Sequence, residues 1–299
     1  MSSKYTWFSS PKYHKEQTVF LGNMARGNDG IVAKLGRFLR RAGLRLSTLL
    51  TLPDNEYEPR TYVFRFGIPL VMKVTHRTVS TEADALRYLN QVAPRLPIPK
   101  LIGSFELDGK VYTIMTKLPG HRLLDKWPQI SAKQCTDVIV KEVTTILYQL
   151  WDISQPVDIK GKVMMSASSH GLPHPRTLRE SLGGPYLSTL ECYDSMSDTK
   201  MSNVSPRITN ALSQDPIVWV HTDLRMQNIL VDDEGHVTGV VDWEDSGWLP
   251  RHWQLHILRR PQWGCMGAWV VYWQSEFRCD DVTEEAYDAS LDGVLVYPL

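Results

Sequence analysis

Three oxygen-bearing side chains stand where short apolar runs end in the stretch 218–242. Asp223 follows the first run, Asn228 opens the second and Asp242 ends the third. The tetrapeptide Asp-Asp-Glu-Gly, between the second and third runs, is typical of a turn, so these runs are predicted to form a β-hairpin. Because antiparallel partners face each other across one turn, the hairpin should bring Asn228 close to Asp242.

A carboxylate beside an amide oxygen suits a hard divalent cation such as Mg²⁺, whose shell is completed by phosphate oxygens and water. Asn228 and Asp242 are therefore the candidate metal ligands. Asp223, one loop away, could accept the proton of a substrate hydroxyl and orient it for attack on phosphorus. Each residue alone could equally cap backbone N–H groups beside a turn, but the set in this order favours the metal site.

The predicted loop and hairpin contain the sequence motif His221-x-Asp223-Leu224-x-x-x-Asn228-Ile229-Leu230, followed by Asp242 after the turn. This pattern resembles the catalytic and metal-binding loops of the aminoglycoside phosphotransferase and choline kinase superfamily. The downstream residues resemble the fungal branch of aminoglycoside-phosphotransferase-like proteins. They are Asp242-Trp243-Glu244, Gly247-Trp248, Pro250 and Trp253.

The resemblance implies an α+β, two-lobed protein-kinase-like fold, with a small β-rich N-lobe and a larger, mostly helical C-lobe. It also implies transfer of the ATP γ-phosphoryl group to a hydroxyl of a small metabolite, with ATP and Mg²⁺ as cofactors. We predict an N-terminal extension with a basic helix (1–60), a nucleotide-binding N-lobe (61–117) and a C-lobe that holds the catalytic and acceptor sites (118–299).

Lys73 is flanked by apolar residues in a predicted strand. A buried ammonium needs an anion, and the resemblance implies that this lysine holds the nucleotide phosphates. Glu82 lies in the first turn of a predicted helix and matches the glutamate that pairs with the lysine in the family. The helix dipole alone also favours an acid at that position.

The segment Met115, Thr116 and Lys117 resembles the hinge between the lobes, where a nucleotide base bonds to backbone groups. Arg225 is placed, by the resemblance, to touch the transferred phosphoryl group. His221 is expected to brace the loop through its ring N–H rather than to move protons. The candidate catalytic residues are Asp223, Arg225 and His221.

The sequence patterns of the other segments predict secondary structure but are less specific about function. The basic stretch 31–52 has apolar residues at helical spacing, and packing on the N-lobe is favoured over a membrane-surface helix or a lid. A capping-box start predicts a helix over 131–151, whereas 154–216 reads as a long irregular region with one short helix near 186–193. Two aromatic-rich helices are predicted at 252–258 and 263–277, where core packing is favoured over an aromatic acceptor cleft.

Composition narrows the class of protein. The 299 residues contain 33 Lys and Arg and 33 Asp and Glu, so no overall charge recruits nucleic acid or an anionic membrane. No apolar run is long enough to span a membrane, and the chain start lacks a signal peptide. The cysteines show no Cys-x-x-Cys spacing, which indicates reduced thiols and a cytoplasmic location. They are Cys135, Cys192, Cys265 and Cys279.

The phosphate-covering loop of kinases is rich in glycine, yet only Gly67 stands between Thr61 and Lys73. Two alternatives therefore stay open beside a hydroxyl kinase. One is a kinase-like scaffold repurposed in metabolite biosynthesis as a nucleotide-independent cyclase or isomerase, with Asp223 or His221 as acid or base. The other is a pseudokinase that binds a ligand or a partner.

Overall fold

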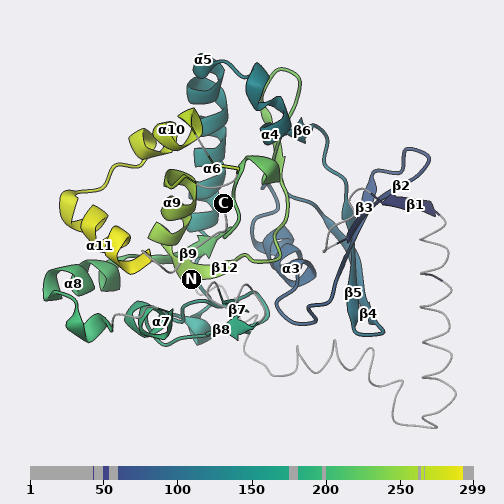
Figure 1. The fold of residues 1–299 in the computed structure, drawn as a ribbon. Helices are drawn as coiled ribbons and strands as arrows, with labels where there is room; N and C mark the ends of the chain where they lie inside the picture. Colours follow the sequence, from purple (N-terminus) through teal and green to yellow (C-terminus); the bar gives the residue numbers. More distant parts are fainter. Residues whose placement is uncertain are drawn as a thin grey trace, which may run out of the picture.

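A computed structural model describes residue 43 and residues 50–53, 60–174, 181–196, 200–261, 264–265 and 267–291. These residues form the predicted α+β architecture, with a β-rich lobe beside a larger helical lobe (Figure 1). The predicted basic helix at 31–52 lies mostly outside the described residues, and its last residue, Leu52, belongs to a strand instead. None of the helices in the described ranges is long and apolar enough to cross a bilayer.

The N-lobe is a five-stranded antiparallel sheet whose spatial order is β1-β2-β3-β5-β4. Its strands are β1 (Thr51–Pro53), β2 (Arg60–Phe64), β3 (Leu70–Thr75), β4 (Leu101–Leu107) and β5 (Lys110–Thr116). Since β1 pairs with β2, residues 51–53, which were assigned to the N-terminal extension, are part of the sheet. The domain limits at 60 and 117 stay a prediction.

The one long helix of this lobe, α3 (Glu82–Val92), contacts β4. It begins with a capping box, in which the Thr81 hydroxyl accepts from the Asp84 N–H and the Asp84 carboxylate accepts from the Thr81 N–H. Leu86 and Leu89 are buried. The cap and the buried stripe therefore fix both the start and the rotation of the helix that carries Glu82.

In the C-lobe, the helix predicted over 131–151 is present as α5 (Ala132–Gln134), the π-helical turn η2 (Cys135–Ile139) and α6 (Val140–Trp151). The Ser131 side chain accepts from the Gln134 N–H, as a capping residue does. The buried side chains of α6 lie in the same core cluster as those of α3 and the catalytic-loop strands. This shared core joins the two lobes.

The predicted hairpin is present, with Ile229 of β10 opposite Val240 of β11. The strand before the catalytic loop, β9, pairs with β12 rather than with the hairpin, and β6 joins the other edge of β10. These strands are β6 (His121–Arg122), β9 (Ile217–Val220), β10 (Ile229–Val231), β11 (Val237–Val240) and β12 (Gly247–Pro250).

The region 154–216 is more regular than the sequence indicated. Its described residues contain two short strands, two 3₁₀ turns and two helices, one of which was not predicted. The missed helix α8 begins at Pro206 after a Ser205 cap, a start signal that the many surrounding polar residues obscure. The elements are η3 (Val157–Ile159), β7 (Leu172–Pro173), β8 (Leu182–Gly183), α7 (Thr189–Met196), η5 (Met201–Asn203) and α8 (Pro206–Gln214).

The remaining elements close the C-lobe. Trp253, Trp269 and Trp273 are buried, which confirms core packing for these aromatics, while Trp263 lies outside the described residues. The short connection after the hinge forms a turn of helix and a 3₁₀ turn. The elements are α4 (Leu123–Lys126), η1 (Trp127–Gln129), α9 (Arg251–Arg259), α10 (Ala268–Glu276) and α11 (Asp281–Leu291).

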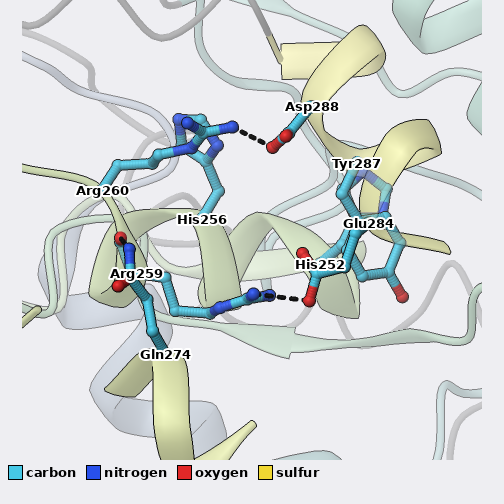
Figure 2. Close-up of a pocket in the computed structure, with 8 residues that line it drawn as sticks. All are labelled: His252, His256, Arg259, Arg260, Gln274, Glu284, Tyr287 and Asp288. Atoms are coloured by element: carbon cyan, nitrogen blue, oxygen red, sulfur yellow. Dashed lines mark hydrogen bonds and ion pairs between the residues drawn. The ribbon is translucent and has the colours of Figure 1, made fainter. Parts of the chain in front are cut away.

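Two ion pairs join α9 to α11, Arg259 with Glu284 and Arg260 with Asp288 (Figure 2). The buried carboxylate of Asp215, which lies just before β9, contacts both helices as well. It accepts hydrogen bonds from the backbone N–H of His252 (2.9 Å), from the His252 ring Nδ1 (2.8 Å) and from the Tyr287 hydroxyl (2.7 Å).

Burial would raise the pKa of Asp215, but the hydrogen bonds from His252 and Tyr287 outweigh that effect and hold the pKa below its ordinary value of 3.8.

We therefore expect Asp215→Asn to lower the free energy of unfolding by about 2–3 kcal/mol at pH 7. A depressed carboxyl pKa stabilises the fold above the unfolded-state pKa, and that contribution is lost as pH falls through the folded-state pKa. Urea denaturation should therefore show the gap between variant and parent shrinking below pH 3.8; a gap that is constant with pH would contradict this account.

Candidate active site

Asn228 and Asp242 flank the open end of the β10–β11 hairpin. The carbonyl of Asn228 accepts from the Val241 N–H at 2.9 Å, which places the two candidate ligands beside each other. The Asn228 side-chain Nδ2 donates to the carbonyl (2.8 Å) and the carboxylate (3.0 Å) of Asp223, so its Oδ1 is the remaining acceptor. Asp242 has a φ of 67°, a left-handed conformation that costs energy in any residue but glycine.

Lys73 lies among three carboxylates and is buried. Its Nζ is 3.2 Å from Glu82 Oε2 and 3.3 Å from Glu244 Oε2, and it donates to Asp242 Oδ1. Burial alone would lower the pKa of Lys73, but the three carboxylates outweigh it and hold the pKa well above its ordinary value. The structure thus brings together Lys73, Glu82 and Asp242, which come from β3, α3 and the end of the hairpin.

Glu244 is a member of this cluster that was not among the predicted site residues. Its burial raises its pKa to about 7, with Lys73 opposing the shift and Asp242 adding to it. Glu244 belongs to the motif Asp242-Trp243-Glu244 of the sequence resemblance. The left-handed conformation of Asp242 and the turn at Glu244 bring both acids to Lys73, while Trp243 between them is buried.

The catalytic loop is braced by a buried histidine. His221 accepts from the Asp223 N–H through Nδ1 (3.1 Å) and donates from Nε2 to the Val241 carbonyl (3.0 Å). Its backbone N–H donates to Gln254 Oε1 at 2.9 Å. Both ring nitrogens are therefore engaged, an arrangement that positions the loop.

Asp223 forms an ion pair with Arg225 through Oδ1 and accepts from the Asn228 amide through Oδ2. The side chain of Asp223 is 13% exposed and that of Arg225 10%. The carboxylate and the guanidinium therefore fix each other at the end of β9, one hydrogen bond away from a candidate metal ligand.

A cleft of about 380 Å³ lies between the two lobes and joins most of the predicted residues. Its lining includes apolar side chains from both lobes, among them Val63, Val71 and Leu230, together with charged and amide groups. The predicted residues that line the cleft are Lys73, Glu82, Met115, Thr116, Lys117, Asn228 and Asp242.

The hinge differs in detail from the expectation. The backbone N–H of Thr116 donates to the Lys100 carbonyl (2.9 Å), and the backbone N–H of Lys117 donates to the Pro69 carbonyl (2.8 Å). Both donors are therefore used within the N-lobe. Leu118, which was not predicted, also lines the cleft. In the described part of the chain, the residues that line the cleft do not include Asp223, Arg225 or His221. Asp223 is connected to the cleft by its hydrogen bond from Asn228, which does line it.

Gly67, the glycine considered for a phosphate loop, lies in the turn between β2 and β3 with a φ of 70°. The connection between β1 and β2 is the other hairpin of this edge of the sheet. Its residues 54–59 are outside the described ranges, and their sequence, Asp-Asn-Glu-Tyr-Glu-Pro, contains no glycine.

Comparisons with known proteins agree with this geometry. Residues 169–285, which include the catalytic loop and Asp242, match the model of the phosphotransferase enzyme family. The crystal structure of aminoglycoside phosphotransferase APH(4)-Ia matches with a TM-score of 0.58 and 16% identity, over 85% of this chain and 88% of that one. The chain has the aminoglycoside phosphotransferase fold. The predicted resemblance to phosphotransferases is confirmed over residues 169–285, and the predicted fold is confirmed by the solved structures; the narrower resemblance to a fungal branch stays a prediction.

Two further structures show the same aminoglycoside phosphotransferase fold. APH(3'')-Id from Streptomyces rimosus matches with a TM-score of 0.53 and 15% identity, over 87% of this chain and 98% of that one. ADP-bound APH(2'')-Ib matches with a TM-score of 0.52 and 15% identity, over 84% and 85%. No curated protein sequence matches this chain.

The lysine cluster of this aminoglycoside-phosphotransferase-like fold should be sensitive to loss of its cation. Lys73→Met leaves the buried carboxyl groups of Glu82 and Glu244 and the half-buried one of Asp242 close together without a cation, and we expect the free energy of unfolding at pH 7 to fall by about 3 kcal/mol. Lys126→Met is the matched control, because it breaks a pair with the exposed Asp233 and should cost at most about 1 kcal/mol. Urea denaturation measures both; equal losses would contradict the assignment of Lys73 to a buried cluster.

Proposed function

We propose that this protein is a kinase that transfers the γ-phosphoryl group of ATP to a hydroxyl of a small molecule. The observation that carries the proposal is that one cleft between the lobes is lined by apolar side chains, by the segment Met115, Thr116 and Lys117, and by Lys73, Asn228 and Asp242. Apolar lining suits a nucleotide base, and the polar groups suit its phosphates.

The donor set at the polar end fits a metal that is bound partly through phosphates. Asp242 and the free amide oxygen of Asn228 are hard oxygen ligands. In the described part of the chain, no group of three or more His, Cys, Asp or Glu residues has a metal-binding arrangement, so the protein supplies only part of a shell. Mg²⁺ accepts that arrangement, because it keeps water and phosphate oxygens. When bound, it would neutralise phosphate charge.

Charge balance also supports a cation at this site. Five carboxyl groups face three cationic side chains here. Burial raises the pKa of Glu244 to about 7, and Asp242 and Asp245 add to the shift, so the site carries at least one net negative charge at pH 7 even with Glu244 protonated. The carboxylates are Glu82, Asp223, Asp242, Glu244 and Asp245, and the cations are Lys73, Arg77 and Arg225.

In the proposed mechanism, Lys73 releases Asp242 when nucleotide binds and its ammonium contacts phosphate oxygens, while Glu82 holds it in place. Asp223 accepts the hydrogen bond of the acceptor hydroxyl and orients its oxygen toward the γ-phosphorus. Because phosphoryl transfer passes through a loose transition state, a carboxylate of ordinary basicity is sufficient. Arg225, already beside Asp223, would donate to the transferred group.

The acceptor is proposed to be a hydroxylated metabolite that is not a polycation. The neighbouring structures include an aminoglycoside phosphotransferase in complex with ADP and hygromycin B, and the region that the resemblance assigns to acceptor binding is 154–216. In this chain that region holds six acidic and six basic residues, a balance of zero. It offers no excess negative charge to attract several ammonium groups.

The geometry gives less support to the two alternatives. A cyclase or isomerase that uses His221 would need a free ring nitrogen, whereas both nitrogens of this buried side chain are bonded. A pseudokinase would have no need for the complete set of Lys73, Glu82, Asp223 and Asp242. A cytoplasmic location and a fungal origin stay predictions.

Mg²⁺ and ATP together should raise the melting temperature of the native chain. At about 100 times the dissociation constant a ligand adds roughly 2.7 kcal/mol, which is a shift of several degrees. Asp242→Ala should abolish the part of the shift that depends on Mg²⁺, whereas Asp233→Ala, at an exposed turn position, should keep it. Absence of any shift at millimolar nucleotide would contradict the kinase proposal.

Asp223→Asn should separate binding from turnover. The amide cannot act as a base, so we expect ADP release to fall at least about 100-fold, while the thermal shift with Mg²⁺ and ATP stays. ADP release is measured during a screen of hydroxylated metabolites. Turnover equal to that of the native chain would overturn the role of Asp223.

A further inference from the structure

The segment that carries Asp242 and Glu244 has no regular secondary structure. It runs from 241 to 246, between the end of β11 and the start of β12, and contains one turn. Two N-lobe residues of the proposed site contact it: Lys73 donates to Asp242 Oδ1, and Glu82 accepts from the Trp243 N–H at 3.0 Å.

Arg77 is a third N-lobe residue that contacts this segment. Its Nη1 donates to Asp245 Oδ1 at 2.6 Å and its Nη2 donates to the Glu244 carbonyl at 2.6 Å. The planar guanidinium thus binds one side chain and one peptide group of consecutive residues, which fixes the orientation of the peptide as well as its position. The side chain of Asp245 is only 7% exposed and that of Arg77 is 19% exposed.

The contact continues into the catalytic loop. The Thr222 hydroxyl donates to the Asp245 carbonyl at 2.8 Å, and Thr222 precedes Asp223 in the chain. Arg77 itself lies between β3, which carries Lys73, and α3, which carries Glu82. One ion pair therefore connects the N-lobe half of the cluster to both C-lobe segments that complete it.

We propose that Arg77 is a positioning residue for phosphoryl transfer: it holds the Asp242–Ser246 segment in place and, through Asp245 and Thr222, it holds the catalytic loop. The expected effect of Arg77 on metal binding rests on the proposed kinase function. Its expected effect on the order of segments 221–228 and 241–247 rests on the contacts alone.

Two variants and one control test the proposal. Arg77→Gln removes the charge and the two-pronged donation, and Arg77→Lys keeps the charge but can donate to only one acceptor at a time in this geometry. Arg87→Gln is the matched control, because Arg87 forms an exposed ion pair with Asp84 in the same lobe and contacts none of the site residues above.

The first measurement is amide hydrogen exchange without nucleotide. In Arg77→Gln we expect exchange in 241–247 and 221–228 to be about 10- to 100-fold faster than in the native chain, with Arg77→Lys between them. Arg87→Gln should match the native chain. Unchanged exchange in Arg77→Gln, or equal acceleration in Arg87→Gln, would overturn the proposal.

The second measurement is Mn²⁺ binding in the presence of the non-hydrolysable nucleotide AMP-PNP, followed by the Mn²⁺ paramagnetic resonance signal. We expect Arg77→Gln to weaken Mn²⁺ binding about 10-fold or more and to leave metal-free nucleotide binding unchanged, a split that a general loss of stability would not produce. Equal Mn²⁺ affinity in the native chain and Arg77→Gln overturns the functional part of the proposal.

The two measurements separate the inference from the kinase proposal. If the native chain binds neither Mn²⁺ nor AMP-PNP, the proposed function fails, and hydrogen exchange alone decides whether Arg77 orders the segment. If Arg77→Gln does not fold, Thr222→Val removes the hydroxyl at the other end of the connection, and faster exchange in 221–228 and 241–247 supports the proposal while unchanged exchange contradicts it.

Discussion

The ammonium of Lys73, held by three carboxylates, is the interaction on which the rest of the site depends. The four groups come from β3, from α3 and from the segment after β11, so the cluster joins elements that are far apart in the sequence. A buried lysine without anions would lose its proton, and buried carboxylates without a cation would repel one another. The cluster therefore exists only when both lobes are folded and correctly placed.

Around this cluster, hydrogen bonds to backbone groups fix the loops that regular structure leaves free. His221 connects Asp223 to the end of the hairpin, Asn228 connects the loop to the cluster, and Thr222 connects it to Asp245. These polar groups are buried, so each bond that is made also avoids the cost of an unsatisfied group. Positioning by such bonds is what phosphoryl transfer requires of a protein, because the reaction needs alignment and charge stabilisation more than covalent chemistry.

Local signals made part of the site predictable. Asp223, Asn228 and Asp242 stand at the ends of apolar runs with turn residues between them, and that order alone predicted the hairpin that is present. Arg77 and Glu244 were missed for different reasons. Arg77 contacts residues 167 and 168 positions away, for which the sequence has no local signal, and Glu244 was quoted within a motif although its side chain gave no independent reason to place it beside Lys73.

The hairpin, the capped helices at 82 and 132 and the residue types that could bind phosphate and metal were predictable from the residues, because they follow from spacing and turn chemistry that act over a few positions. The fold class was predicted from the family resemblance of the catalytic-loop pattern. Tertiary structure was needed to show which acids surround Lys73, that the hinge N–H groups of Thr116 and Lys117 are used within the N-lobe, and that β1 joins the sheet. Those outcomes depend on long-range packing and on competition among buried partners, which no local pattern records.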